Sequence, residues 1–198
     1  MRIFVGIPLA AEVLGEISAE VARLRSREDG LRWTLPESWH ITLQFLGTVR
    51  PEQYECLVER LGKVRCAPIP LQLEGMGFFD RAGIVYAGVG LTPGLIALQR
   101  SITAATAQCG FLPEMRPYHP HITLARTKGR RRPTGKFQAR MQPQPRFSRF
   151  VAEEFLLYES HLSPDGSTYE VREHFPLEGP SGSSPLAPGG DSQLPAEI

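Results

Sequence analysis

The chain has 198 residues, 41% of them hydrophobic, with 22 lysine and arginine residues against 21 aspartate and glutamate residues. That hydrophobic share is enough to bury a core, and a net charge of +1 does not by itself indicate a polyanionic partner. No apolar run approaches the roughly eighteen residues of a membrane span, and the N-terminus is too soon interrupted for a secretory signal.

The cysteine content favours a reduced protein. Cys56, Cys66 and Cys109 are an odd number and show no CxxC spacing, so neither a disulfide framework nor a cysteine-based zinc site is expected. The three residues fall in or beside predicted helices, where we interpret them as packing residues. A soluble, cytoplasmic location is the resulting expectation.

The first third of the chain alternates strands with helices. Residues 2–7 are mostly β-branched or aromatic and predict a strand. A helix follows, with apolar residues three and four apart at Val13, Leu14, Ile17, Val21 and Leu24. A short extended piece at 31–35 and a strand at 40–46 come next. Pro51 then suits the first turn of a second helix, whose buried face comprises Tyr54, Leu57, Val58, Leu61 and Val64.

The remainder contains strands and one further helix. Thr92 and Pro93 form an N-cap and first-turn pair that opens a helix with Leu95, Leu98, Ile102 and Ala105 facing inward. Strands are predicted at 69–80, 83–90, 121–125, 150–157 and 168–175. Asp80 to Gly83 is a plausible hairpin turn between the first two.

The C-terminal segment 179–198 differs in composition from the rest. Twelve of its twenty residues are glycine, proline or serine. Such a segment buries too little apolar surface to offset its ordering entropy, so we expect a disordered tail. Residues 1–178 are then a single folded domain.

An internal repeat relates the two halves of this domain. The sequence Ile3-Phe4-Val5-Gly6-Ile7 is echoed by Val85-Tyr86-Ala87-Gly88-Val89, with an offset of 82 residues. His40-Ile41-Thr42-Leu43 recurs identically as His121-Ile122-Thr123-Leu124, with an offset of 81. We therefore expect an α+β fold of two pseudo-symmetric strand–helix–strand lobes, with two antiparallel sheets lining a central cleft and helices outside.

The repeated tetrapeptide predicts a two-histidine site. Alternation along a strand places His40 and Thr42 on one face, with Ile41, Leu43 and Phe45 pointing into the core. His121 and Thr123 pair likewise, and a twofold axis would set the two pairs opposite each other. One imidazole can then serve as base and the other as acid, as phosphodiester cleavage requires. The hydroxyls can donate to phosphoryl oxygens.

A structural role is the alternative for a single copy of this motif. An isolated HxT in a strand is usually a half-buried polar position with a satisfied partner. Two identical copies placed symmetrically, in a chain with only five histidines, favour the catalytic interpretation.

The motifs and their surroundings resemble those of the 2H phosphoesterase superfamily. The resemblance rests on the stretches from Trp39 to Gly47 and from Arg116 to Arg126, and extends over most of residues 1–177. Within the superfamily, the chain is most similar to the RNA 2′,3′-cyclic phosphodiesterase branch, also called the 2′-5′ RNA ligase family. Further similarities are Ile3 to Pro8, Arg32-Trp33, Leu157 to Ser160 and Gly166 to Tyr169.

The resemblance implies an enzyme that opens terminal 2′,3′-cyclic phosphates on RNA without a metal or other cofactor, leaving a 2′-phosphomonoester. It also implies that the reverse reaction can join RNA ends through a 2′-5′ bond. By position, His40 would be the proton donor and His121 the proton acceptor. Thr42 and Thr123 would hold the phosphate. Because both halves of the site lie on one chain, a monomer is expected.

His119 is an additional histidine two residues before His121. A metal pair is one interpretation, but Pro120 and the lack of a third nearby ligand argue against it. We interpret His119 as a neighbour that tunes His121, or as an edge-of-strand residue. His161 and His174 lie outside the motifs and are expected at the surface.

A basic stretch and several aromatic residues are candidate RNA contacts. Residues 126–149 carry nine basic and no acidic side chains, and the following 150–178 carry seven acidic ones. Such a stretch either grips RNA or balances the acidic strands, and Arg126 is the preferred phosphate ligand. Further candidate RNA contacts are Lys128, Arg130 and, for base stacking, Trp33 and Tyr118.

Other functions are compatible with the same residues. A two-histidine cleft would also serve an ADP-ribose cyclic phosphate or a 2′-5′-linked oligonucleotide. An RNA-binding module without catalysis, a scaffold acting through the tail, and a metal hydrolase using His119 and His121 are rivals from other classes.

Overall fold

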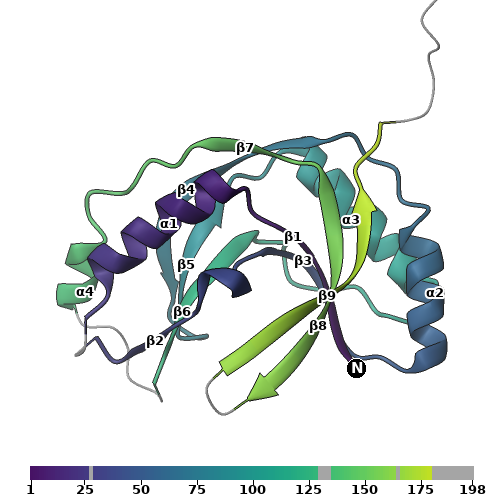
Figure 1. The fold of residues 1–198 in the computed structure, drawn as a ribbon, viewed down its shortest axis with the longest axis horizontal. Coiled ribbons are helices and arrows are strands. Elements are labelled where there is room, and N and C mark those ends of the chain that lie inside the picture. Colours follow the sequence, from purple (N-terminus) through teal and green to yellow (C-terminus); the bar gives the residue numbers. More distant parts are fainter. Residues whose placement is uncertain (27–28, 129–134, 164–165, 180–198) are drawn as a thin grey trace, which may run out of the picture.

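The computed structural model describes residues 1–26, 29–128, 135–163 and 166–179. It contains two antiparallel sheets (Figure 1). Four strands form one sheet, in the order β3 (Ile41–Thr48), β1 (Arg2–Ile7), β8 (Glu154–Ser163) and β9 (Gly166–Pro176). Five form the other, in the order β2 (Leu31–Trp33), β6 (His121–Thr127), β5 (Ile84–Val89), β4 (Ile69–Phe79) and β7 (Arg149–Ala152).

The helices follow the predicted apolar periodicity closely. They are α1 (Ala11–Leu24), the 3-10 helix η1 (Pro36–Ser38), α2 (Pro51–Leu61), α3 (Pro93–Ala107) and α4 (Gly135–Arg140). Thr92 caps α3 as expected, because its hydroxyl accepts a hydrogen bond from the backbone N–H of Leu95 at 3.2 Å. The helices η1 and α4 were not predicted. None of the described helices is long and apolar enough to cross a membrane.

The order of the strands supports the internal repeat. In one sheet β1 lies between β3 and β8, and in the other β5 lies between β6 and β4. The repeated segments β1 and β5 therefore hold equivalent central places, each antiparallel to a strand that carries an HITL motif. The α+β fold expected from the sequence is confirmed.

One predicted strand is wrong in its extent. Residues 150–157 were expected to form a single strand, but they contribute to both sheets. Ala152 pairs with Ile69 of β4, whereas Phe155 pairs with Phe175 of β9. Alternating burial along a sequence cannot show that a strand leaves one sheet and enters another, since both pieces bury one side against the same core.

A β-bulge interrupts each HITL motif at its leucine. Across the β1–β3 pair, Gly6 is opposite Thr42 and Val5 is opposite Gln44, which leaves Leu43 without a partner. Across the β5–β6 pair, Tyr86 is opposite Thr123 and Val85 is opposite Ala125, which leaves Leu124 unpaired in the same way. Each bulge reverses the alternation of side chains beyond it.

The bulges overturn the prediction that Phe45 is a core residue. Its side chain is 71% exposed, while the preceding Gln44 is only 7% exposed. The corresponding residues of the second motif are the exposed Arg126 and the buried Ala125. The two bulges thus place Phe45 and Arg126 on the same faces as the motif histidines and threonines. We call the face of each sheet that carries these side chains its motif face.

The buried Gln44 depends on a hydroxyl from α3. Thr106 donates a hydrogen bond to its Oε1 at 2.9 Å, while its Nε2 has no partner among the described residues. Replacing Thr106 with valine should lower the free energy of unfolding by about 1–3 kcal/mol, because the carbonyl of Gln44 then stays buried and unpaired. Urea denaturation measures the effect.

Two variants make this prediction specific. Thr103→Val, at a half-buried position one turn earlier on α3, should lower the free energy of unfolding by less than Thr106→Val does. The double variant Gln44→Leu/Thr106→Val should recover most of the loss, because both polar partners are removed together. If the losses of the two single variants simply added in the double variant, the hydrogen bond between Thr106 and Gln44 would not be the source of the effect.

The cysteine prediction is wrong for two of the three residues. Cys56 of α2 and Cys109, just after α3, form a disulfide with a Cα–Cα distance of 5.8 Å. An odd cysteine count without recognisable spacing did not suggest it. The packing of α2 against α3 brings the two residues together across 53 positions of sequence. Cys66 is a free, half-buried thiol, and burial raises its pKa. The predicted tail lies outside the described residues, apart from Gly179.

Candidate active site

The two motif strands meet where the sheets adjoin. Strand β3 comes within contact distance of β6. The hydroxyl of Tyr118, just before β6, donates to the backbone carbonyl of Thr42 at 3.1 Å. The hydroxyl of Thr34 bonds to the carbonyls of Thr123 and Leu124, at 3.0 and 2.8 Å. Each motif is therefore held by a side chain from outside its own strand.

The two histidines have matching hydrogen bonds. Nδ1 of His40 lies 2.8 Å from the carbonyl oxygen of Ser38, and Nδ1 of His121 lies 2.8 Å from that of His119. A carbonyl oxygen only accepts, so each Nδ1 carries the proton. Each Nε2 is then unprotonated in the neutral ring, and neither forms a hydrogen bond with another described residue. Both rings are prepared to exchange a proton at Nε2.

The histidines share an electrostatic environment that favours their neutral forms. Burial lowers the pKa of His40 to about 4, the bond to Ser38 opposes this, and the charge of His121 lowers it further. Burial also lowers the pKa of His121, with additional lowering by the charges of His119 and Arg126. The contact between β3 and β6, the strands that begin beside His40 and at His121, is the geometric basis of this interaction.

A pair of stacked aromatic rings supports each histidine. Phe4 stacks on Tyr158 with ring centroids 4.8 Å apart, and the ring of His40 lies 4.6 Å from Phe4. In the other half Tyr86 stacks on Phe79 at 4.0 Å, and the ring of His121 lies 5.0 Å from Phe79. The stacked pairs restrict the movement of the two histidine rings and exclude water from one side of each. The sequence repeat aligns Phe4 with Tyr86, but in the sheets Tyr86 lies opposite Thr123 as Gly6 lies opposite Thr42, so the two supporting rings come from non-equivalent positions.

Gly6 provides the space in which the His40 ring sits. A Cβ at this position would lie 3.0 Å from the carbonyl oxygen of Ile41 and 3.3 Å from Cδ2 of His40. We expect Gly6→Ala to displace the imidazole and lower kcat about tenfold or more, because small misplacements of catalytic groups are costly. The measurement is turnover of the substrate proposed below.

Gly15 offers a control for this substitution. A Cβ there meets nothing within 4 Å, so Gly15→Ala in α1 should leave kcat unchanged. Full activity of Gly6→Ala would show that the ring position does not depend on this contact.

The remaining candidates differ in where the structure places them. Thr42 and Thr123 are half-buried on the motif faces, and Arg126 is exposed on the same face as Thr123. Trp33 is not brought to a motif face: its indole N–H donates to Asp29 at 2.8 Å and its ring lies near Phe137.

Three further candidates lie near the second motif in sequence. The Tyr118 ring is half-buried beside the first motif, and burial raises its pKa. Lys128 is exposed just beyond β6. Arg130 lies outside the described residues. His119 is exposed, with its ring 6.3 Å from that of His121, consistent with the tuning role considered for it.

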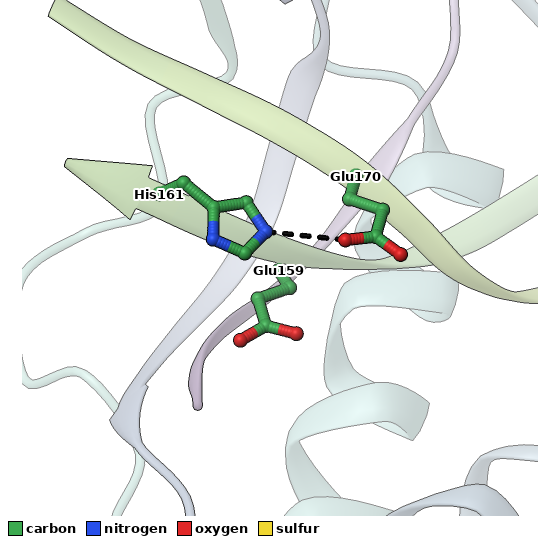
Figure 2. A group of neighbouring side chains, drawn as sticks. All are labelled: Glu159, His161 and Glu170. Carbon is green, nitrogen blue, oxygen red and sulfur yellow. Dashed lines mark hydrogen bonds and ion pairs between the residues drawn. The ribbon is translucent and has the colours of Figure 1, made fainter. Parts of the chain in front are cut away.

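A cluster of possible metal ligands lies on the β8–β9 hairpin, on the side that points away from the motif face. Figure 2 shows Glu159, His161 and Glu170, whose ligand atoms lie within 4.8 Å of one another. Nε2 of His161 is 3.2 Å from Glu170, and the guanidinium of Arg172 contacts Glu159 and Glu170 at 3.4 and 3.2 Å. Arg172 already balances the two carboxylates. Since Tyr158 points toward His40, the neighbouring Glu159 points away from the motif face.

Comparison with known proteins identifies the family. A model described as the 2′-5′ RNA ligase superfamily matches residues 13–163. The chain belongs to this superfamily. The resemblance drawn from the HITL motifs is thereby confirmed.

Relatives within the 2′-5′ RNA ligase superfamily carry one common name. The chain is 33% identical over 189 residues to the RNA 2′,3′-cyclic phosphodiesterase of Geobacillus stearothermophilus, covering 89% of this chain but only 57% of that protein. It is 32% identical over 170 residues to that of Escherichia coli K12, covering 85% of this chain and 92% of the relative. The expected enzyme class is confirmed at the level of the family.

Solved structures of the superfamily match the fold. Apo LigT of Escherichia coli superposes with a TM-score of 0.76 at 30% identity, covering 89% of this chain and 96% of that one. The protein TT0787 of Thermus thermophilus gives a TM-score of 0.73 at 29% identity, covering 91% and 100%. Another structure is LigT complexed with 3′-AMP, with a TM-score of 0.75.

Proposed function

We propose that this protein hydrolyses the terminal 2′,3′-cyclic phosphodiester of RNA to a 2′-phosphomonoester. The observation that carries the proposal is the matched pair His40 and His121, each with Nδ1 bonded to a carbonyl and Nε2 available. The name shared by the superfamily relatives supports the substrate class.

The reaction is a paired proton transfer. Nε2 of His121 takes a proton from water as the water oxygen attacks phosphorus. The bond from phosphorus to the 3′-oxygen breaks, and the imidazolium form of His40 gives its Nε2 proton to that oxygen. The negative charge of the bound phosphate diester stabilises this form against the effect of burial, which lowers the pKa of His40. The phosphate stays on the 2′-oxygen, and proton exchange with solvent restores both rings. A 5′-hydroxyl of a second RNA in place of water would form a 2′-5′ bond.

The other residues of the site bind the phosphate. The hydroxyls of Thr42 and Thr123 donate to the non-bridging oxygens, whose charge rises in the transition state. Arg126, exposed on the motif face beyond the second bulge, supplies a positive charge for the RNA backbone. The proposal requires no metal, and it treats the protein as a cytoplasmic monomer.

Product analysis tests this function. A short RNA with a 2′,3′-cyclic phosphate end should be converted to the 2′-phosphate, at an unchanged rate in EDTA. Loss of activity in EDTA would favour a metal hydrolase, and binding without product would favour an RNA-binding module. Turnover only with an ADP-ribose cyclic phosphate or a 2′-5′ oligonucleotide would assign a different substrate to the same site.

A substrate with sulfur at the 3′ bridging position tests the two histidine roles. A thiolate leaves without help from an acid, so this substrate should rescue the variant that lacks the proton donor. We expect rescue of His40→Ala and none of His121→Ala. The reverse pattern would exchange the two roles and leave the proposed reaction intact.

A further inference from the structure

A hollow opens on the five-stranded sheet beside His121. Its volume is about 390 Å³, within the range of small-molecule sites. The residues that matter here are Glu74, Met76, Tyr86, Gly88, His119 and Pro120. The Tyr86 and His119 rings lie 5.8 and 6.3 Å from the His121 ring. The hollow therefore begins one ring away from the phosphate position proposed above.

Glycines and one fixed ring shape this hollow. A Cβ on Gly88 would meet nothing closer than 3.8 Å, so the strand has room for a side chain here but carries none. A Cβ on Gly77 would lie 2.5 Å from the Tyr86 ring, which shows that the ring crosses directly over this glycine. Stacking on Phe79 holds the ring there. Bare backbone and an aromatic side chain together offer the kind of surface that a planar base packs against.

The hollow also carries a carboxylate without a partner. Glu74 is exposed and forms neither a hydrogen bond nor an ion pair with any other described residue. Its Oε1 lies 3.0 Å from the place where a Cβ of Gly90 would stand, so the carboxylate lies directly beside this glycine. A carboxylate repels phosphate, and in a nucleotide site it is suited to donors on a base.

Among the four RNA bases, guanine fits this carboxylate best. Its N1–H and N2–H₂ donors are adjacent and can bond to both carboxylate oxygens at once. Adenine, cytosine and uracil each place an acceptor next to their donor, which the carboxylate repels. We propose that the hollow binds the base of the terminal nucleotide and that Glu74 selects guanine there. The inference rests on the proposed function and adds the base preference of the substrate.

Initial rates on the four nucleoside 2′,3′-cyclic phosphates and on inosine 2′,3′-cyclic phosphate test the proposal. We expect kcat/KM to favour guanosine by about ten- to hundredfold, the discrimination typical of a bidentate contact to a base. Inosine lacks the N2 amine, so its 2′,3′-cyclic phosphate should have a lower kcat/KM than that of guanosine. In Glu74→Gln the preference for guanosine over inosine should largely disappear.

Three controls separate the outcomes. Glu55→Gln, which removes an exposed charge on α2, should keep the preference. Gly88→Val, which fills the hollow, should lose the preference for guanosine. Ribose 2′,3′-cyclic phosphate, which has no base, should be hydrolysed equally by wild type and Glu74→Gln.

The results distinguish this inference from the proposed function. If none of the cyclic phosphates is hydrolysed, the proposed function fails. Hydrolysis with equal kcat/KM for all four bases would overturn the base preference alone. A guanosine preference that persists in Glu74→Gln would overturn the role of Glu74.

Discussion

Replacing His40 or His121 with alanine should each lower kcat/KM for a 2′,3′-cyclic phosphate by about 10²–10⁴-fold, the usual contribution of one general acid or base. The two rings are the only groups of the proposed mechanism that move protons, and each is presented through a single free Nε2. Steady-state rates on an RNA oligonucleotide measure the loss.

Asparagine variants separate catalysis from positioning. The amide of His40→Asn or His121→Asn can still donate to the carbonyl that Nδ1 contacts, but nothing replaces Nε2. These variants should be as inactive as the alanine variants while keeping the native circular dichroism spectrum. His161→Ala and His174→Ala, which remove exposed histidines paired with Glu170 and Glu154, should retain full activity. Substantial activity in both asparagine variants would exclude a two-histidine mechanism.

The pH profile of kcat/KM should be bell-shaped, with both limbs below the ordinary histidine pKa of about 6.5. The pKa of His40 is lowered to about 4 and that of His121 is lowered as well, chiefly by burial. Below the lower pKa both rings are protonated and no base remains. Above the higher pKa both are neutral and no acid remains. Only the singly protonated site reacts, so activity should be greatest between these values.

Two comparisons test whether the two histidines give rise to the limbs of the pH profile. His119→Ala removes a charge that lowers the pKa of His121, so the limb that reports the titration of His121 should move to higher pH. The profile of kcat should also lie at higher pH than that of kcat/KM, because a bound phosphate diester stabilises the imidazolium forms. Circular dichroism at each pH confirms that the protein stays folded. A profile with its alkaline limb above pH 7 for kcat/KM would contradict the pKa directions.

Some features of the chain required its three-dimensional structure. Period-two alternation placed Phe45 in the core, but a bulge at Leu43 turns it outward and buries Gln44 instead. A bulge is one extra residue in a ladder, and its position depends on the partner strand. Likewise, no local signal indicated that Cys56 and Cys109 would meet, because helix packing determines that contact.

The sequence by itself determined the α+β class and most helices and strands, and it predicted the duplication and the candidate catalytic pair His40 and His121. These follow from local periodicity and from exact repetition, which survive in one dimension. Only the tertiary structure decided which atoms of those histidines are free and that stacked rings support them. It also decided that Glu74 lines a hollow beside the site. Such properties arise between segments distant in the chain, where burial and hydrogen bonding depend on the packed neighbours.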